Sequence, residues 1–202
     1  MQKTFSRVLI GAAIAAAWGI SHAADAPIRL RGTIEKVDAK TLVVKAQDGK
    51  VIPLALTDSS RVDEVLPIDP NAIQEGTFVG TTAVPRADGS LSAVEVHVFP
   101  ESARGTGEGH RPWDLKPNST MTNATVEKIT QGSNERTMKL RYKDGEQTIR
   151  IPNGVPVVTM KPGDRSLLVT GAKVIVNEQL ANGQPPVAAR VLVGRNGFEP
   201  PM

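Results

Sequence analysis

The sequence predicts an all-β protein made of two small barrels, and three observations support this: its composition, its hairpin pattern and an internal repeat. The 202 residues combine 40% hydrophobic residues with 18 Gly and 15 Pro, which is too apolar for a disordered tail and too rich in turn formers for a helical bundle. Alternating segments flank Asp-Gly dipeptides, which favour tight hairpins. Because this pattern occurs twice, we expect two tandem five-stranded OB-like Greek-key barrels from an internal duplication.

The N-terminal segment has the features of a secretory signal peptide. A positively charged start precedes an uncharged apolar run over residues 8–20, and Ser21-His22-Ala23 places small residues where a signal peptidase reads. The apolar run is shorter than the roughly 20 residues that span a bilayer. We therefore expect a signal peptide over residues 1–23, a periplasmic location and no membrane span in the mature chain.

Charge and cysteine content narrow the class of protein. The formal net charge is +3, but Lys3 and Arg7 lie in the segment expected to be removed, so the mature chain is nearly neutral. A nearly neutral exported protein is not expected to bind nucleic acid. The chain has no cysteine, which excludes disulfides, thiolate metal sites and thiol nucleophiles.

An internal repeat defines the domain organisation. Equivalent segments recur at nearly constant spacing: Thr33-Ile34-Glu35-Lys36-Val37 as Thr125-Val126-Glu127-Lys128-Ile129, Asp48-Gly49 as Asp144-Gly145, residues 76–79 as 171–174, and Asp88-Gly89 as Asn182-Gly183. We assign the first β-barrel repeat to 28–100, a Gly-rich linker to 101–119 and the second β-barrel repeat to 120–196. A module of this size has a thin core, so we expect the two barrels to pack on each other.

Each copy is expected to contain three strands, a Pro-containing segment with short helical potential, and two further strands. In the second copy, Met138, Leu140 and Tyr142 alternate with charged residues and are expected in the core. In the last strand of the first copy, one face should point into the barrel and the other away from it, with Val94, Val96 and Val98 inside and Glu95, His97 and Phe99 outside.

The linker supplies the candidate ligand-binding residues. It contains the only tryptophan of the mature chain, beside a histidine, an arginine and two carboxylates. Loops carry function more readily than strands, and an aromatic side chain among polar groups is typical of a ligand contact. The candidates are Glu108, His110, Arg111, Trp113 and Asp114. The alternative is that Trp113 fills the seam between the barrels while its charged neighbours form solvated ion pairs.

A divalent metal site has weak candidates in His97 and His110. Carboxylates in and near the linker could complete such a site, but no pair of residues shows a spacing that makes metal binding specific. His97 corresponds to Leu192 in the second copy, which favours a packing role. The methionines are scattered through the sequence and add no metal signal. We therefore expect no cofactor, and metal binding stays an alternative.

The sequence carries no recognisable catalytic motif. It has no Gly-x-Ser-x-Gly elbow, and its Gly-rich run over residues 105–109 lacks both the Gly-Lys-Ser/Thr of a P-loop and the strand-to-helix setting of a dinucleotide site. Single-stranded nucleic acid is usually bound by aromatic side chains on such barrels. Only Tyr142 lies in the relevant strands, and it is expected in the core. We predict neither an enzyme nor a nucleic-acid-binding protein.

Four segments resemble a known group of proteins: residues 80–85, 94–101, 105–114 and 189–194. They look like those of exported proteobacterial proteins of unknown function whose β-barrel module is similar to domain of unknown function 5666. The resemblance covers nearly the whole mature chain and implies no catalytic or binding residues. Some members carry the automatic label "metal ABC transporter permease", from which this chain departs because its mature sequence has no membrane-spanning helices.

These observations favour a binding or accessory module over an enzyme. One version is a protein–protein adaptor in the cell envelope, which would contact an envelope protein through the open edge strands of short barrels. The alternative is a periplasmic metal or small-ligand binding protein that uses the linker between the barrels.

Overall fold

The structure, a computed structural model, describes residues 29–181 and 184–202. This part of the chain consists of β-strands and short 3-10 turns and contains no α-helix, which confirms the predicted all-β class. Two expectations lie outside the described residues: the signal peptide over 1–23 and the Asn182-Gly183 turn.

The two sequence repeats contain equivalent strands. The first repeat forms β1 (Arg29–Val37), β2 (Thr41–Ala46), β3 (Val51–Ala55), β4 (Arg61–Pro67), β5 (Phe78–Pro85) and β6 (Leu91–Val98). The second repeat forms β8 (Thr120–Gln131), β9 (Glu135–Tyr142), β10 (Gly145–Pro152), β11 (Val157–Pro162), β12 (Lys173–Ala181) and β13 (Gln184–Gly194). Between them lies β7 (Gly109–Pro112), and the 3-10 turns are η1 (Pro70–Ala72), η2 (Glu101–Ala103), η3 (Arg165–Leu167) and η4 (Arg195–Gly197).

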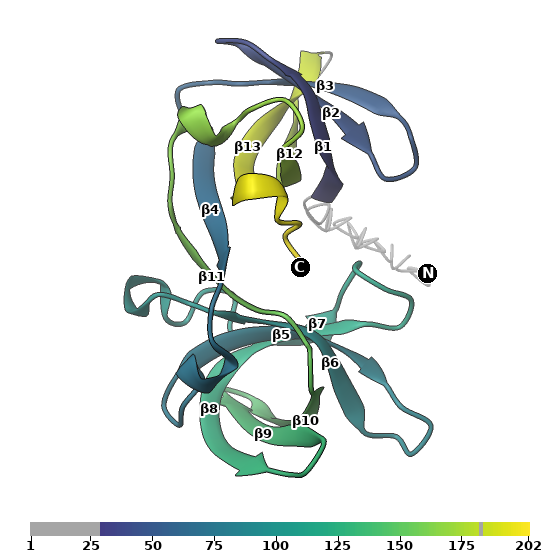
Figure 1. Cartoon of the computed structure of the whole chain (residues 1–202), viewed down its shortest axis with the longest axis vertical. Helices are drawn as coiled ribbons and strands as arrows, with labels where there is room; N and C mark the ends of the chain where they lie inside the picture. The colour runs from purple at the N-terminus through teal and green to yellow at the C-terminus, as the bar shows by residue number, and fades with distance from the viewer. Residues whose placement is uncertain (1–28, 182–183) are drawn as a thin grey trace, which may run out of the picture.

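Barrel 1 is closed by β1, β2, β3, β13 and β12 (Figure 1). Antiparallel ladders join β12 to β1, β1 to β2, β2 to β3 and β12 to β13, and a parallel bridge between Ala55 and Val187 completes the ring. Inward-facing side chains fill its core, among them Leu42, Val44, Leu54, Val176 and Val191. This Greek-key order, in which the third strand runs parallel to the last, is that of an OB-like barrel.

Barrel 2 has the same order, with β8, β9, β10, β6 and β5 in the corresponding places. The parallel closure joins β10 to β6 at Ile149 and Leu91. Its core includes Val79, Val96, Ala124, Met138 and Leu140, with Tyr142 packed against it. The core positions expected for Met138, Leu140 and Tyr142 are therefore as predicted.

Each barrel takes three strands from one repeat and two from the other. The chain crosses between the barrels through β4 and β11, which pair antiparallel with Val65 opposite Met160 (Figure 1). The structure thus differs from the expected assembly of one barrel per repeat: segments 28–100 and 120–196 are sequence repeats, but neither closes a barrel alone. Periodicity cannot reveal this exchange, because equivalent strands offer equivalent partners.

Strand irregularities recur at equivalent places in the two copies. The register shifts between Ile34 and Lys36 in β1 and between Val126 and Lys128 in β8. Such bulges change the direction of the following side chains. A bulge also lies in β6 at Val94, so Ala93 joins Val96 in the core of barrel 2 and Val94 does not, contrary to simple alternation.

A third apolar cluster lies apart from the two barrel cores, on β4, β11, β12, β13 and the residues after them. It contains Val65, Val158, Met160, Ile175, Leu192 and Met202, with Phe99 and Phe198 against it. The last residues of the chain lie between the barrels (Figure 1). The two barrels therefore pack on each other, as expected for modules with thin cores.

The segment 101–119, expected as a Gly-rich linker, contains η2 and β7, and β7 pairs with β8 at the margin of barrel 2. This pairing fixes the side chains of the segment against the seam. Among the residues that the structure describes, no helix has the length and apolar character to cross a membrane.

Candidate functional site

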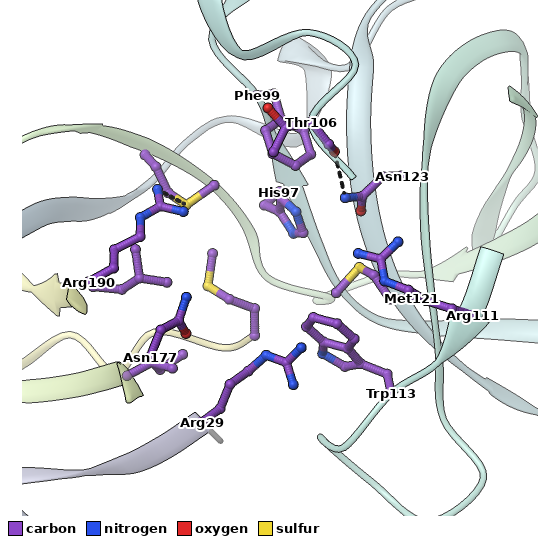
Figure 2. Close-up of a pocket in the computed structure, with 14 residues that line it drawn as sticks. Arg29, His97, Phe99, Thr106, Arg111, Trp113, Met121, Asn123, Asn177 and Arg190 are labelled. Atoms are coloured by element: carbon purple, nitrogen blue, oxygen red, sulfur yellow. Dashed lines mark hydrogen bonds between the residues drawn. The ribbon is translucent and has the colours of Figure 1, made fainter. Parts of the chain in front are cut away.

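A cavity of about 140 Å³ lies between the two barrels (Figure 2). Barrel 2 and the 101–119 segment contribute one wall, formed by His97, Phe99, Thr106, Arg111, Trp113, Met121 and Asn123. Barrel 1, β11 and the last residues of the chain contribute the other, formed by Arg29, Met160, Ile175, Asn177, Arg190, Leu192 and Met202. The cavity therefore has an apolar lining with a few polar groups, as is typical of small-ligand sites.

His97 is the buried imidazole of this cavity, with a relative exposure of 5%. His97 follows Val96 on β6, and the side chain of Val96 points into the core of barrel 2. Because successive side chains of a strand point to opposite faces, the imidazole of His97 points away from barrel 2 and into the seam. Nδ1 lies 3.1 Å from Oε2 of Glu95, and the ring meets Phe99 edge-on with centroids 4.8 Å apart. When Nδ1 donates to Glu95, Nε2 is left with the free lone pair.

Glu95 is completely buried beneath His97. Its Oε1 accepts hydrogen bonds from the backbone N and from Oγ1 of Thr82, both at 2.8 Å. Its Oε2 faces His97, the one ion-pair partner of Glu95 among the described residues. This carboxylate therefore fixes the orientation of the imidazole, as acidic partners of functional histidines do.

Asn123 brings a polar atom without a partner to the same wall. Its side chain is 5% exposed, and Nδ2 donates to the carbonyl oxygen of Thr106 at 2.9 Å. Its Oδ1 has no hydrogen-bond partner among the described residues, and the same is true of Nε1 of Trp113. A buried polar atom that lacks a partner costs about 1–3 kcal/mol, so two of them beside one cavity point to a missing bonding partner.

Trp113 lies in the seam between two arginines. The guanidinium carbon of Arg29 is 3.6 Å from the ring centroid and that of Arg111 is 5.3 Å away, which are cation–π distances. Asp114, the next residue, forms ion pairs with Arg29 at 3.2 Å and with Arg31 at 3.0 Å. These contacts attach the 101–119 segment to barrel 1.

The charges near Trp113 shift the pKa values of their neighbours. Partial burial raises the pKa of Asp114, but its hydrogen bond to Arg31 and the positive charges of Arg31 and Arg29 outweigh this, and its pKa lies below the ordinary value. Burial, and then the charge of Arg29, lower the pKa of Arg111. The guanidinium of Arg111 donates to the carbonyl oxygen of Gly107 at 2.7 Å, and no carboxylate pairs with it within the described residues.

The structure separates the five linker candidates into three positions. Arg111 and Trp113 line the cavity, whereas Glu108 and Asp114 lie with them around a shallower groove on the outside. His110 points from the opposite face of β7 and is exposed, with Nδ1 2.8 Å from Oγ1 of Thr122. Partial burial, and then the charge of Arg111, lower the pKa of His110.

The expected combination of histidine and carboxylates at a metal site is not formed in the part of the chain that the structure describes. No group of three or more His, Cys, Asp or Glu side chains in residues 29–181 and 184–202 could hold a metal ion. His97 lines the cavity, but His110 does not.

The structure gathers three of the methionines that the sequence scatters. Met121, Met160 and Met202 line the cavity, and their exposed fractions are 2%, 9% and 7%. Met138, by contrast, lies in the core of barrel 2. Spacing could not reveal this group because its members come from β8, β11 and the C-terminal segment. The alternation in β6 could place His97 beside Glu95 on the outer face, but not in one cavity with Met121.

The imidazole of His97 and the buried amide of Asn123 come from barrel 2. Gly80, His97 and Asn123 are neighbours across β5, β6 and β8; the corresponding strands of barrel 1 carry Ile175, Leu192 and Arg31. The repeat therefore supplies two similar faces, and substitutions in one face create the imidazole and amide groups of the cavity.

Comparisons of the chain with protein-family models, with curated proteins and with solved structures gave no match. Function is therefore inferred from the geometry of the cavity.

Proposed function

We propose that the protein is an exported binding module that holds a small ligand in the cavity between its two barrels. One observation carries this proposal: Asn123 and Trp113, which line the cavity with His97, each have a buried polar atom that lacks a hydrogen-bond partner among the described residues. A seam that served only to join the barrels would be more stable with apolar side chains in these places.

The shape of the cavity agrees with a binding role. Its walls come from both barrels, from the 101–119 segment and from the last residues of the chain, so an occupant would contact all of them at once. Small-ligand sites are often found at such interfaces between structural units. The N-terminal sequence pattern supports export to the periplasm, where the ligand would be met.

A protein–protein adaptor is the second candidate, and the open edge of β7 favours it. Among the strands that the structure describes, β7 pairs with β8 alone, so its other edge is open there to a partner strand. It is only four residues long and ends at Pro112, which limits the ladder that could form there. We therefore prefer the ligand-binding role.

The test is a binding screen by saturation-transfer NMR with small organic acids, neutral amides and alcohols, together with calorimetric titration of monovalent and divalent metal salts. We expect at least one probe to bind. Ile175→Phe or Leu192→Phe, which put a larger side chain into the cavity from barrel 1, should abolish this binding. Val169→Phe, at an exposed site outside the cavity, is the matched control. Binding that survives both wall variants while they remain folded, or no binding by any probe, would contradict the proposal.

A further inference from the structure

We infer that the cavity is a site for a soft monovalent cation, Cu(I) or its analogue Ag(I), held by Nε2 of His97 and by thioether sulfurs of the surrounding methionines. This inference rests on the proposed function, since it names the ligand of the same cavity. It follows from three features: an imidazole oriented by a carboxylate, thioether groups that line the cavity from separate elements, and the buried negative charge of Glu95 beside the imidazole.

The imidazole of His97 is arranged as a metal ligand is. Histidines that bind metals almost always donate their other ring N–H to a carboxylate or carbonyl, which fixes the tautomer and increases ligand basicity. Here Glu95 occupies that place, 3.1 Å from Nδ1, and is itself fixed by two hydrogen bonds from Thr82. Nε2 makes no hydrogen bond within the described residues; it lies against Gly80, which has no side chain, on a residue that lines the cavity.

Thioethers supply the remaining donors. Met121 approaches from the same wall as His97 (Figure 2), and Met160 and Met202 line the cavity from the side of barrel 1. Thioether sulfur is a soft ligand that selects Cu(I) over the harder divalent ions. Met202 is held in place by its carbonyl oxygen, which accepts a hydrogen bond from Nε of Arg31 at 3.1 Å. Met160 is the weakest donor of the three, since its sulfur is 3.9 Å from the guanidinium of Arg190.

One buried negative charge, that of Glu95, lies directly beside His97, while arginines line other parts of the cavity. Of the three arginines that line it, Arg190 pairs with Asp63 at 2.6 Å, and Arg29 shares Asp114 with Arg31, at 3.2 and 3.0 Å. Glu95, in contrast, has no lysine or arginine partner among the described residues. A cation on Nε2 would be stabilised by this buried carboxylate through the ring, whereas a bound anion would be repelled by it.

The third arginine of the cavity, Arg111, allows an experiment that distinguishes a bound cation from a bound anion. Arg111 lines the cavity without a carboxylate partner in the described structure, so its charge opposes a bound cation and attracts a bound anion. Arg111→Gln should therefore strengthen Ag(I) binding and weaken the binding of a small anion. The opposite response would identify the cavity as an anion site.

The experiment is a calorimetric titration of the purified protein with silver nitrate in chloride-free buffer, with zinc as the divalent comparison. Ag(I) needs no reductant, so the titration measures binding alone. We expect one Ag(I) per chain and weaker or absent Zn(II) binding. Met121→Leu and Met202→Leu keep the side-chain volume and remove the sulfur. Loss of a residue that only orients a metal ligand weakens binding by roughly 10- to 100-fold. Loss of a ligand itself should weaken Ag(I) binding by more than this. Met138→Leu, in the core of barrel 2, should leave it unchanged.

The outcomes of these titrations test the cation site and the broader proposal of a binding module separately. Ag(I) binding lost in the cavity variants but not in Met138→Leu supports both the site and its ligand. If an organic probe binds the cavity and Ag(I) does not, the cation site is wrong and the binding module stands. If neither binds, both proposals fail. Ag(I) binding that Met138→Leu weakens as much as Met121→Leu and Met202→Leu do would place the ion elsewhere and overturn the inference.

Discussion

Gly80 lies directly opposite His97 in the antiparallel ladder of β5 and β6, and a Cβ atom on Gly80 would overlap Nε2 and Cε1 of the imidazole. The equivalent pair in barrel 1 is Ile175 and Leu192, two apolar side chains that belong to the third apolar cluster. The absence of a side chain at residue 80 is therefore what admits an imidazole to the seam.

Gly80→Ala should destabilise the protein by about 1–3 kcal/mol, the range for overpacking a close-packed region. Urea denaturation measures this difference. In the double variant Gly80→Ala/His97→Ala the clash with the ring is removed, so the loss of stability should be smaller than the sum of the single losses. Additive losses would show that the two residues are not in contact.

Glu95→Gln should switch the tautomer of His97. The backbone N–H of Thr82 needs an acceptor, so the amide oxygen of the glutamine would stay there and its NH₂ group would face His97. Nδ1 would then have to accept, which moves the ring proton to Nε2. Long-range ¹H–¹⁵N NMR spectra of the imidazole distinguish the two tautomers.

Thr82→Val is the control for this change, because it removes only the Oγ1 hydrogen bond to Glu95. It should lower the free energy of unfolding by about 1 kcal/mol and leave the tautomer of His97 as it is. A tautomer that does not change in Glu95→Gln would argue against the orienting role of the carboxylate.

Asp114→Asn should weaken the attachment of the 101–119 segment to barrel 1 in a pH-dependent way. Because the pKa of Asp114 lies below its ordinary value of 3.8, the ionised carboxylate stabilises the folded protein above that pH, and this stability is lost as the pH falls through the lowered folded value. The group is half-exposed, so we expect a loss of at most about 1 kcal/mol at neutral pH.

The measurement is urea denaturation of both proteins at neutral pH and at acidic pH below 3.8. The difference between Asp114→Asn and the unmodified protein should shrink as the pH falls. Asp58→Asn, on an exposed turn, controls for the loss of one negative charge. A difference that stays constant with pH would mean that the ion pairs with Arg29 and Arg31 do not contribute.

The exchange of strands between the repeats predicts fragment complementation. A fragment that ends after residue 100 contains β1 to β6 but lacks the two strands that close barrel 1, and the remaining fragment lacks β5 and β6 of barrel 2. Each fragment alone should be largely unfolded by circular dichroism, and mixing them should restore β-structure in a one-to-one complex. Two fragments that fold separately would show that each repeat can close its own barrel.

Sequence patterns predicted the five barrel strands of each copy and the duplication, because alternation and Asp-Gly turns are local features, but they did not predict β4, β7 or β11. They could not predict which copy supplies the closing strands, since β5 and β12 occupy equivalent positions in their repeats. Candidate residues near Trp113 were recognisable from their composition. The approach of Met121 and Met202 to His97 depends on long-range packing of three separate segments, which no spacing in the sequence encodes.

The most direct measurement is methyl NMR of the protein labelled with ¹³C at the methionine methyl groups, recorded during titration with Ag(I). Binding in the inter-barrel cavity predicts large shifts for Met121 and Met202 and a resonance of Met138 that does not move. Methionine resonances that all stay in place, or shifts confined to Met138, would contradict a cation site between the barrels.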